Sequence, residues 1–515
     1  MWLFRESNIL IKIKKRENYM KLSKKLILSS SAFAALAAGA LAVACSTNPG
    51  TGDAPEVTGT LKEKAEKTLS NWSGTLKVAY EESWKKALDK AITLLPENMR
   101  NRVELVKVAN GGAIEYVNTT VTNQGATAAD LFPVQLDKFQ DLINKQLVAA
   151  VDESSLTDYG DNKKLVKIEN TYYGFPLNVE SVIAFYNKDV YPNGPGDITT
   201  EFKDPVGKKF AFQAGNLWHG STFLNGLFAD QKNGNLEEAK NMWVTYNGTT
   251  KTAPFLTDEQ SKQTLKELWT YVNALRTSTN ENYKIVANSS ANREKTIRSG
   301  IADQSISLTI EGPWILSDLV ASVLKNNKST PEKATEILSK ISASVLPKYG
   351  TRQLRHFIGG WAYSLNKASL ASFSKEAKAI DGKAHFANYF ANVLTSKDLA
   401  TEWMTEAGKM SAATGAVVNM DVKTLEFNDP TNDKAPKIKT TEYIGTTGFA
   451  EAVNNLYKAV IDSVSKQSSL NLEQPKWPGK QYWEPYDALG LTTATYTTAD
   501  AFLEAFTKNI ELQLK

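Results

Sequence analysis

The sequence predicts an α/β fold, and three observations support this. Short apolar, β-branched stretches alternate with stretches in which apolar residues recur at helical spacing, a pattern typical of α/β architectures. No internal repeat interrupts the alternation. The chain has 515 residues, and 471 of them (515 less 44) follow Ala44. That length suggests two large lobes or more, each with its own core.

The N-terminal region carries a signal for export and lipidation. Three lysines lie within five residues after Met20, the apolar stretch Leu26–Val43 follows, and small residues lead to Cys45, the only cysteine of the chain. This order predicts a lipoprotein signal peptide at 20–44, with the Cys45 thiolate as the nucleophile that takes the lipid. Leu41 lies four residues before Cys45, one more than in the usual lipobox. The alternative is a transmembrane anchor with a chance cysteine.

The residues on either side of this signal are predicted to lie outside the fold. Residues 1–19 read as a charged upstream extension, and 45–70, rich in Gly, Pro, Thr and charge, read as a flexible tether. Two acyl chains on one cysteine suffice for stable membrane attachment. No later segment approaches ~20 consecutive apolar residues, the length that spans a bilayer. We therefore expect a lipid-anchored protein on the extracellular face of the cell membrane.

The formal net charge of +4 is concentrated at the N-terminus. Residues 1–44 hold eight Lys and Arg against two acids, a net of +6, which leaves about −2 for the rest of the chain. Nucleic-acid binding thereby loses its main electrostatic support. With no second cysteine, intrachain disulfides are excluded, so stability must come from packed cores.

Local patterns predict the elements in order. Strands are expected at short apolar or β-branched runs, namely Leu76–Tyr80, Val103–Val108, Ala129–Pro133, Tyr172–Pro176, Ser181–Tyr186, Lys209–Gln213, Ile306–Ile310, Ser342–Leu346 and Trp361–Leu365. Helices are expected where apolar residues recur every three or four positions, namely Ser83–Leu95, Asn118–Gly125, Phe139–Val148, Ala384–Val393, Lys397–Ala407 and Ala450–Val464. Two polar stretches, Asn233–Asn292 and Asn419–Thr441, are expected to be surface insertions.

Several segments, in chain order, resemble the type 1 extracellular solute-binding proteins of ABC importers, especially the maltose/maltodextrin-binding branch. The most specific is YGFPLNVESVIAFYNKDVYP at Tyr173–Pro192. The others include ADLFPVQLDKF at 129–139, REKTIRSGIADQSISLTIEGPW at 293–314, FIGGWAYSLNKAS at 357–369 and YFANVLTSKDLATEW at 389–403. The resemblance spans roughly residues 74–490.

This resemblance implies a periplasmic-binding-protein-like fold, in which hinge crossovers join two discontinuous lobes around a ligand groove. Lobe 1 would comprise 71–182 and 362–425, and lobe 2 would comprise 183–361 and 426–515. The Ile183–Tyr186 strand and the Gly359–Leu365 stretch would be among the crossings.

The function that the resemblance implies is capture of a small solute, foremost an oligosaccharide of the maltodextrin type. The chain, expected to be a monomer without cofactor, would deliver the solute to an ABC permease and its ATPase subunit. No G-x-x-x-x-G-K-[ST] loop is present, so ATP hydrolysis falls to the separate membrane complex. His219, His356 and His385 are scattered without metal-ligand spacing, and no metal site is expected.

Aromatic side chains are the first candidates for sugar contacts, because sugars present weakly apolar C–H faces that suit flat rings. By resemblance, Trp314, after Gly312-Pro313, and Trp218, in GNLWHG, would stack on sugar rings. Trp483 or its neighbour Tyr482 would take a C-terminal stacking place. Trp361 follows two glycines at a crossing and would face the groove. For each ring the alternative is a place in a core.

Charged side chains are the second candidates, because hydrogen bonds to charged groups are stronger than neutral ones. Asp137 and Lys138 resemble an acid–base pair of the family that binds sugar hydroxyls. Arginine is usual where Lys138 stands, so bidentate geometry is lost. Glu180, just before a crossover strand, resembles a ligand-binding glutamate. One of Glu81 and Glu82, foremost Glu82, is expected to contact solute after the first strand.

Three other interpretations stay open at this point. A surface glycosidase would need two facing carboxylates about 5–9 Å apart, for which Glu180 with Glu311 or Asp137 would be the pair. A structural or adhesive lipoprotein would keep the fold without transport. Within the binding class, a sugar phosphate, glycerophosphodiester or peptide are alternatives, although a phosphate calls for convergent Arg and Lys.

Overall fold

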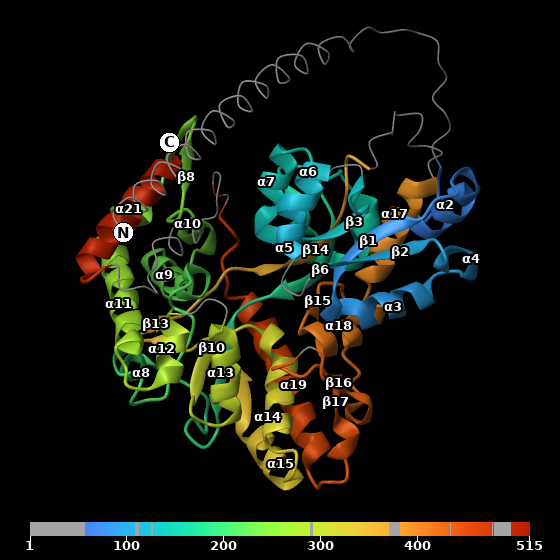
Figure 1. Cartoon of the computed structure of the whole chain (residues 1–515). Coiled ribbons are helices and arrows are strands. Elements are labelled where there is room, and N and C mark those ends of the chain that lie inside the picture. Colours follow the sequence, from blue (N-terminus) through green and yellow to red (C-terminus); the bar gives the residue numbers. More distant parts are fainter. Residues whose placement is uncertain are drawn as a thin grey trace, which may run out of the picture. The chain divides into compact units, whose positions relative to one another are not determined.

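Two hydrophobic cores organise the part of the chain that the structure describes. This computed structural model describes residues 57–108, 113–124, 127–288, 292–369, 382–432, 434–475, 477 and 496–514, all within the unit Val57–Lys515. The first core draws on residues 65–179 and 361–413, and the second draws on residues 182–357, Met404 and 422–510. We name the two regions lobe 1 and lobe 2. Each lobe is assembled from segments that are far apart in the sequence (Figure 1).

A six-stranded sheet forms the centre of lobe 1. Its order is β15 (Met410–Ser411), β6 (Phe175–Glu180), β14 (Gly359–Leu365), β3 (Leu131–Gln135), β1 (Leu76–Glu81) and β2 (Val103–Val108). β1 pairs in parallel with β2 and β3, whereas β14 runs antiparallel to β3 and β6. Every residue of β6 and β14 is buried, so both faces of these central strands are covered.

Helices cover the sheet of lobe 1, and α3 and α17 contact its strands (Figure 1). The helices of this lobe are α2 (Leu61–Thr68), α3 (Lys85–Leu94), α4 (Glu97–Arg100), α5 (Ala113–Glu115), α6 (Thr122–Gln124), α7 (Phe139–Asn144), α17 (Gly382–Leu394) and α18 (Ala400–Ala407). α18 lies at the boundary of the lobes, because its Trp403 belongs to the first core and its Met404 to the second.

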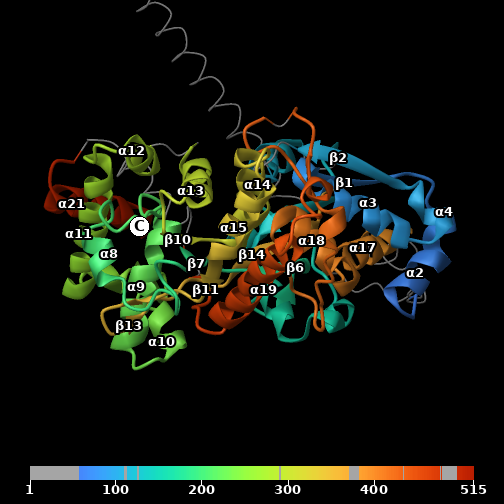
Figure 2. The same ribbon diagram turned by 90° about the horizontal axis from the view of Figure 1, so that it is seen from below.

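Lobe 2 is built around a smaller antiparallel sheet, β10 (Leu308–Glu311), β7 (Ile183–Asn187) and β11 (Ile341–Ser344). Most of its mass is helical, as Figure 2 shows on the side of α9 and α11. Its helices are α8 (Thr199–Lys203), α9 (Leu217–Gln231), α10 (Leu236–Lys240), α11 (Glu259–Arg276), α12 (Glu281–Asn288), α13 (Arg293–Ala302), α14 (Leu316–Asn326), α15 (Pro331–Lys340), α19 (Phe449–Ser468) and α21 (Ala499–Leu514).

The prediction that Asn233–Asn292 is a surface insertion is wrong. Trp243 is fully buried in the second core, and α11 places Leu268 and Tyr271 there. The polar residues that dominate the sequence pattern lie on the outer faces of amphipathic helices, whose apolar stripes face inward. The other predicted insertion, Asn419–Thr441, lies only partly at the surface, because its Phe427 is buried.

The strand predicted at Lys209–Gln213 does not form. Phe210 makes only an isolated bridge to Leu308. Lys209 has a φ of 52°, a left-handed conformation that interrupts extended backbone.

The chain crosses between the two cores at three places, namely between Glu180 and Ile183, between Phe357 and Trp361, and between residues 413 and 422. The first two crossings lie side by side, because Gly359 is opposite Glu180 in the β14–β6 ladder. Gly360 has a φ of 148°, and the Asn178 carbonyl oxygen occupies the space that a Cβ would need there. Only glycine fits this close approach.

One buried amide ties the first two crossings together. Asn471 donates from Nδ2 to Ser181 Oγ at 2.7 Å and to the Phe357 carbonyl at 3.2 Å. Its Oδ1 accepts from the His356 backbone N–H at 2.9 Å. The chain direction at the two crossings is thereby fixed by a single side chain from the segment that follows α19.

Candidate functional site

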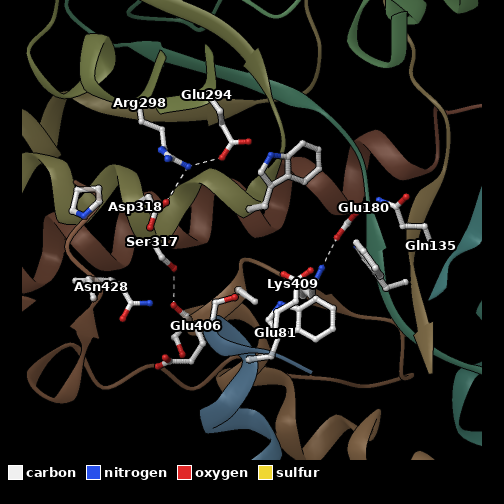
Figure 3. A pocket seen from close by; sticks show the side chains of 18 of the residues that line it. Glu81, Gln135, Glu180, Glu294, Arg298, Ser317, Asp318, Glu406, Lys409 and Asn428 are labelled. Carbon is white, nitrogen blue, oxygen red and sulfur yellow. Dashed lines mark hydrogen bonds and ion pairs between the residues drawn. The ribbon is translucent and has the colours of Figure 1, made fainter. Parts of the chain in front are cut away.

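A cavity of about 610 Å³ is lined by side chains of both lobes. Its volume falls within the ~300–1,000 Å³ typical of small-ligand sites. Lobe 1 supplies the carboxyl ends of the parallel strands β1 and β3 through Glu81 and Gln135, the edge of an α/β sheet at which ligands commonly bind. Lobe 2 supplies the N-terminal turn of α9, the exposed face of α13 and the start of α14. Figure 3 shows labelled side chains from both lobes facing one another across it.

The wall on lobe 1 is a closely packed group of two indoles and one ammonium. Trp84 and Trp361 meet edge to face, with ring centroids 5.5 Å apart. Lys409 Nζ lies 5.0 Å from the centroid of Trp84 and 4.8 Å from that of Trp361. It also forms an ion pair with Glu180 Oε1 at 3.0 Å. The lysine is therefore held by two cation–π contacts and one charge.

Glu180 is fixed on this wall by a short network. Asn178 Nδ2 donates to Glu180 Oε1 at 2.8 Å, and Asn178 Oδ1 accepts from the backbone N–H of Trp361 at 3.0 Å. These contacts join β6, β14 and the segment that holds Lys409 at the point where two crossings begin. A movement of the crossings would therefore directly change the positions of these cavity side chains.

The wall on lobe 2 carries Trp218 and Trp314, both half-buried. Trp218 lies in the first turn of α9, whose N-cap Asn216 accepts from the Trp218 backbone N–H at 2.8 Å. Trp314 directly follows the end of β10 and the Gly312-Pro313 turn. Between them, His219 lies edge-on to Trp314 with centroids 6.3 Å apart. The rings therefore present surface to the cavity from a rigid helix start and a tight turn.

His356 connects Trp218 to a crossing. Its fully buried ring meets the Trp218 indole edge to face at 4.5 Å, and its Nε2 lies 2.9 Å from the Trp218 carbonyl oxygen. Burial, and then the charge of His219, lower the pKa of His356 to about 3. The neutral ring fixes the position of Trp218 relative to the chain segment that enters lobe 1.

Two carboxyl groups of lobe 2, Glu311 and Glu294, interact electrostatically at this side of the cavity. Glu311 is fully buried and accepts hydrogen bonds from Gln213 Nε2 and from the Gly312 backbone N–H. His219 Nε2 lies 3.4 Å from Glu311 Oε2. Burial, and then the negative charge of Glu311, raise the pKa of Glu294 to about 7. Ionisation of Glu294 is therefore disfavoured by its burial and by the neighbouring carboxylate.

Arg298 lies between two of these acids. It pairs with Glu294, one turn earlier on α13, and with Asp318 at 2.9 Å on α14 (Figure 3). Nearby, Ser317 Oγ donates to the Thr405 carbonyl at 2.7 Å, a direct hydrogen bond from α14 to α18. The lobes are thus in contact at one side of the cavity.

Four residues proposed from the sequence line this one cavity, namely Trp314, Trp218, Glu180 and Trp361. Three others do not. Asp137 and Lys138 lie in the turn after β3, two and three residues beyond the lining residue Gln135. Glu82 is exposed and pairs with Lys107 at 2.8 Å, while its neighbour Glu81 lines the cavity. Trp483, Tyr482 and Cys45 lie outside the described residues.

The sequence analysis missed several lining residues, foremost Trp84, Lys409, Glu294 and Arg298. Trp84 could have been predicted from the sequence. It lies three residues after the end of the first strand, and ligands commonly bind at the carboxyl ends of such strands. Lys409 had none, because it reaches the site through a partner 229 positions away.

The described residues offer neither a metal site nor a membrane-spanning helix. No group of three or more His, Cys, Asp and Glu side chains is placed to hold a metal ion there. Among the same residues, no helix combines the length and the apolar character needed to cross a membrane.

Comparison with known proteins gives consistent matches. A model of the bacterial extracellular solute-binding proteins matches residues 97–436. The maltodextrin-binding protein MdxE of Bacillus subtilis is 26% identical over 196 residues, which are 36% of this chain and only 42% of that protein's length.

Solved structures match over most of the chain. A cyclo/maltodextrin-binding protein complexed with maltotetraose gives a TM-score of 0.55 at 18% identity, over 86% of this chain and 98% of its own. The maltose-maltodextrin binding protein of Alicyclobacillus acidocaldarius gives 0.55 at 14% identity, over 85% and 100%. At such identities the likeness concerns the fold, and it confirms the predicted two-lobed α/β architecture.

Proposed function

Since the chain belongs to the family of bacterial extracellular solute-binding proteins, we propose that it captures an oligosaccharide of the maltodextrin type between its two lobes. It then delivers this ligand to an ABC importer. The observation that carries the proposal is the single cavity in which Trp218 and Trp314 of lobe 2 face Trp361 and Glu180 of lobe 1. The relatives named above, which bind maltodextrin or were solved with maltotetraose, support this choice of ligand.

The chemistry of the lining suits a sugar. Indole faces cover the C–H faces of pyranose rings, and carboxylates and amides accept or donate to the hydroxyls at their edges. A ligand that contacts both walls favours the closed arrangement only through contacts that the open one lacks. Trp314, Trp218, Trp361 and Glu180 are the residues we assign to the ligand. Trp483, Tyr482, Asp137, Lys138 and Glu82 remain predictions.

The proposal extends to the anchor and the partners. The signal at 20–44 directs export, Cys45 takes the lipid, and the residues before α2 tether a monomer to the extracellular face of the membrane. The expected tether 45–70 is too long at its C-terminal end, because Leu61–Thr68 form α2, which buries Ala65 in the core of lobe 1. The permease and its ATPase subunit receive the closed form. The expected lobe bounds need adjustment, because Trp361 belongs to the core of lobe 1, whereas Val182, Val422 and Leu425 belong to the core of lobe 2.

The test is a titration of intrinsic tryptophan fluorescence with maltotetraose, a sugar phosphate and a short peptide. Several indoles line the cavity, so closure around the correct ligand changes the emission saturably. We expect a response to maltotetraose alone. A response only to the phosphate or the peptide would replace the oligosaccharide with that class.

The same mixtures separate binding from catalysis and from a non-transport role. Chromatography of the sugar after incubation should return it intact, whereas shortened products would establish a glycosidase. No response to any solute would favour a structural or adhesive lipoprotein.

A further inference from the structure

The charges around the cavity are strongly unequal. Among the described residues that line it, seven are carboxylates and two are cations. The carboxylates are Glu81, Glu180, Glu294, Asp318, Glu406, Glu426 and Asp429, and the cations are Arg298 and Lys409. Such an excess concentrates positive ligands and repels negative ones.

Both cations of the lining are already engaged. Arg298 is 13% exposed and is shared by Glu294 and Asp318. Lys409 is 6% exposed, lies over two indoles and pairs with Glu180 at 3.0 Å. An incoming phosphate or carboxylate would have to break one of these pairs, and a buried pair that loses one partner is costly. The cavity therefore offers an anion no ready partner.

Three rim carboxylates are neutralised from outside the cavity. Lys86 pairs with Glu406 at 2.9 Å, Lys325 with Asp429 at 2.7 Å and Lys439 with Glu426 at 3.3 Å. With the Lys409–Glu180 pair, this balances four of the seven acids. Of the remaining three, Glu294 and Asp318 both pair with Arg298, so Glu81 is the lining carboxylate for which the described residues show no ion pair.

Glu81 lies at the end of β1, is 7% exposed and lines the cavity. One carboxylate oxygen accepts from the Ala113 backbone N–H at 3.2 Å. Within the described residues no Lys, Arg or His lies within ion-pair distance of it. A buried carboxylate in this state is stabilised by a donor, and most by a positively charged one.

The lobe 2 side of the cavity also has a buried carboxylate. Glu311 is buried, and its charge acts on Glu294. His219 is 4% exposed, lines the cavity and makes no hydrogen bond through either ring nitrogen. Its Nε2 lies 3.4 Å from Glu311 Oε2. Both lobes thus place a buried carboxylate at or beside the cavity, Glu81 in lobe 1 and Glu311 in lobe 2.

We infer that the cavity prefers saccharides that carry protonated amines over matched neutral ones, and that it rejects saccharides bearing carboxylate or phosphate groups. This inference rests on the proposed function, because it specifies which oligosaccharides the cavity takes. Glu81 is the residue that contributes most to the preference.

The experiment compares three ligands of one shape by calorimetry. They are maltotetraose, its analogue with an amine at each C6, and its analogue with a carboxylate at each C6. At low salt we expect the amine analogue to bind about tenfold more tightly than maltotetraose, and the carboxylate analogue at least about tenfold more weakly. Both differences should shrink in high salt, since screening weakens charge interactions.

Two variants sharpen the result. Glu81→Gln keeps an oxygen for the Ala113 N–H and removes the charge, so it should reduce the amine-to-neutral affinity ratio several-fold. Glu332→Gln, on the exposed face of α15 and outside the lining, should leave that ratio unchanged. A structural defect in Glu81→Gln would weaken all three ligands alike, and the ratio would stay constant.

The outcomes separate the two proposals. Equal binding of the three analogues overturns the charge preference and leaves oligosaccharide binding standing. A ratio that stays constant in Glu81→Gln, while its affinity for maltotetraose equals that of the wild type, does the same. Binding of none of the three overturns the proposed function itself. Tightest binding of the carboxylate analogue overturns the inference outright.

Discussion

The two walls of the cavity differ in how far their side chains are already satisfied by the protein. On the lobe 1 wall, Trp84 and Trp361 are only 2% and 9% exposed, and Lys409 sits over both rings. On the lobe 2 wall, Trp218 and Trp314 are half-buried, and neither ring nitrogen of His219 makes a hydrogen bond. One wall is packed like a core, and the other keeps exposed ring surface.

This difference suggests a division of roles. Trp84, at 2% exposed, has little surface left for a ligand, and its removal leaves a hole. A half-buried ring at a helix start or turn loses less packing when removed and more ligand contact. Substitutions on the two walls should therefore separate stability from affinity.

The largest effect is expected from Trp84→Ala on the lobe 1 wall. Trp84 packs edge to face against Trp361, Tyr363 and Trp403. Removing a buried indole should lower the free energy of unfolding by about 3–5 kcal/mol, measured by urea denaturation. A loss under about 1 kcal/mol would mean that this wall is not part of the core, and the contrast between the walls would fail.

The elements that the sequence predicted well are those whose pattern is local. Val103–Val108 is β2 without change, and the predicted Leu76–Tyr80 extends by one residue to Glu81. A run of apolar residues bounded by polar ones sets a strand without help from distant segments. The predicted insertion at Asn233–Asn292 failed because a short stretch does not reveal which face of an amphipathic helix meets a core, as with α11.

Site residues could be predicted from the sequence where they lie in a motif that resembles the solute-binding family. Trp314, Trp218, Glu180 and Trp361 line the cavity as proposed from their motifs. Lys409 and Arg298 were not found, because each is defined by an ion pair with another segment rather than by its neighbours in sequence. When a charged residue pairs with a partner from a distant segment, the residues around it in the sequence show no pattern that predicts the pair.

Trp314→Ala on the lobe 2 wall should have the next largest effect, now on affinity. Loss of a stacking indole should weaken maltotetraose binding by about 1.5 kcal/mol or more, and should cost less stability than Trp84→Ala. Calorimetry gives the first quantity and urea denaturation the second. Tyr246→Ala, an exposed aromatic outside the lining, serves as the control with unchanged affinity. Unchanged affinity in Trp314→Ala would remove this ring from the site.

The smallest effect is expected from Glu294→Gln. This variant tests whether ionisation of Glu294 on the lobe 2 wall destabilises the fold. Burial and Glu311 raise the pKa of Glu294 from its usual 4.5 to about 7, with Asp318 acting in the same direction and Arg298 and His219 opposing it. A raised pKa in the folded state means that the protonated form stabilises the fold. That contribution is full below about pH 4.5 and is lost as the pH rises through about 7. The glutamine does not ionise, so it escapes this loss.

The melting temperature of Glu294→Gln, taken relative to the wild type, should therefore rise between pH 5 and about 7.5 and stay level above about 8. Glu294 is 40% exposed, and its pair with Arg298 is lost in the variant, so the rise with pH, rather than its absolute height, is the diagnostic quantity. The exposed Glu332→Gln should show a flat difference over the same range. A flat difference for Glu294→Gln as well would mean that neither burial nor Glu311 raises the pKa of Glu294, and the electrostatic contrast between the two walls would fail.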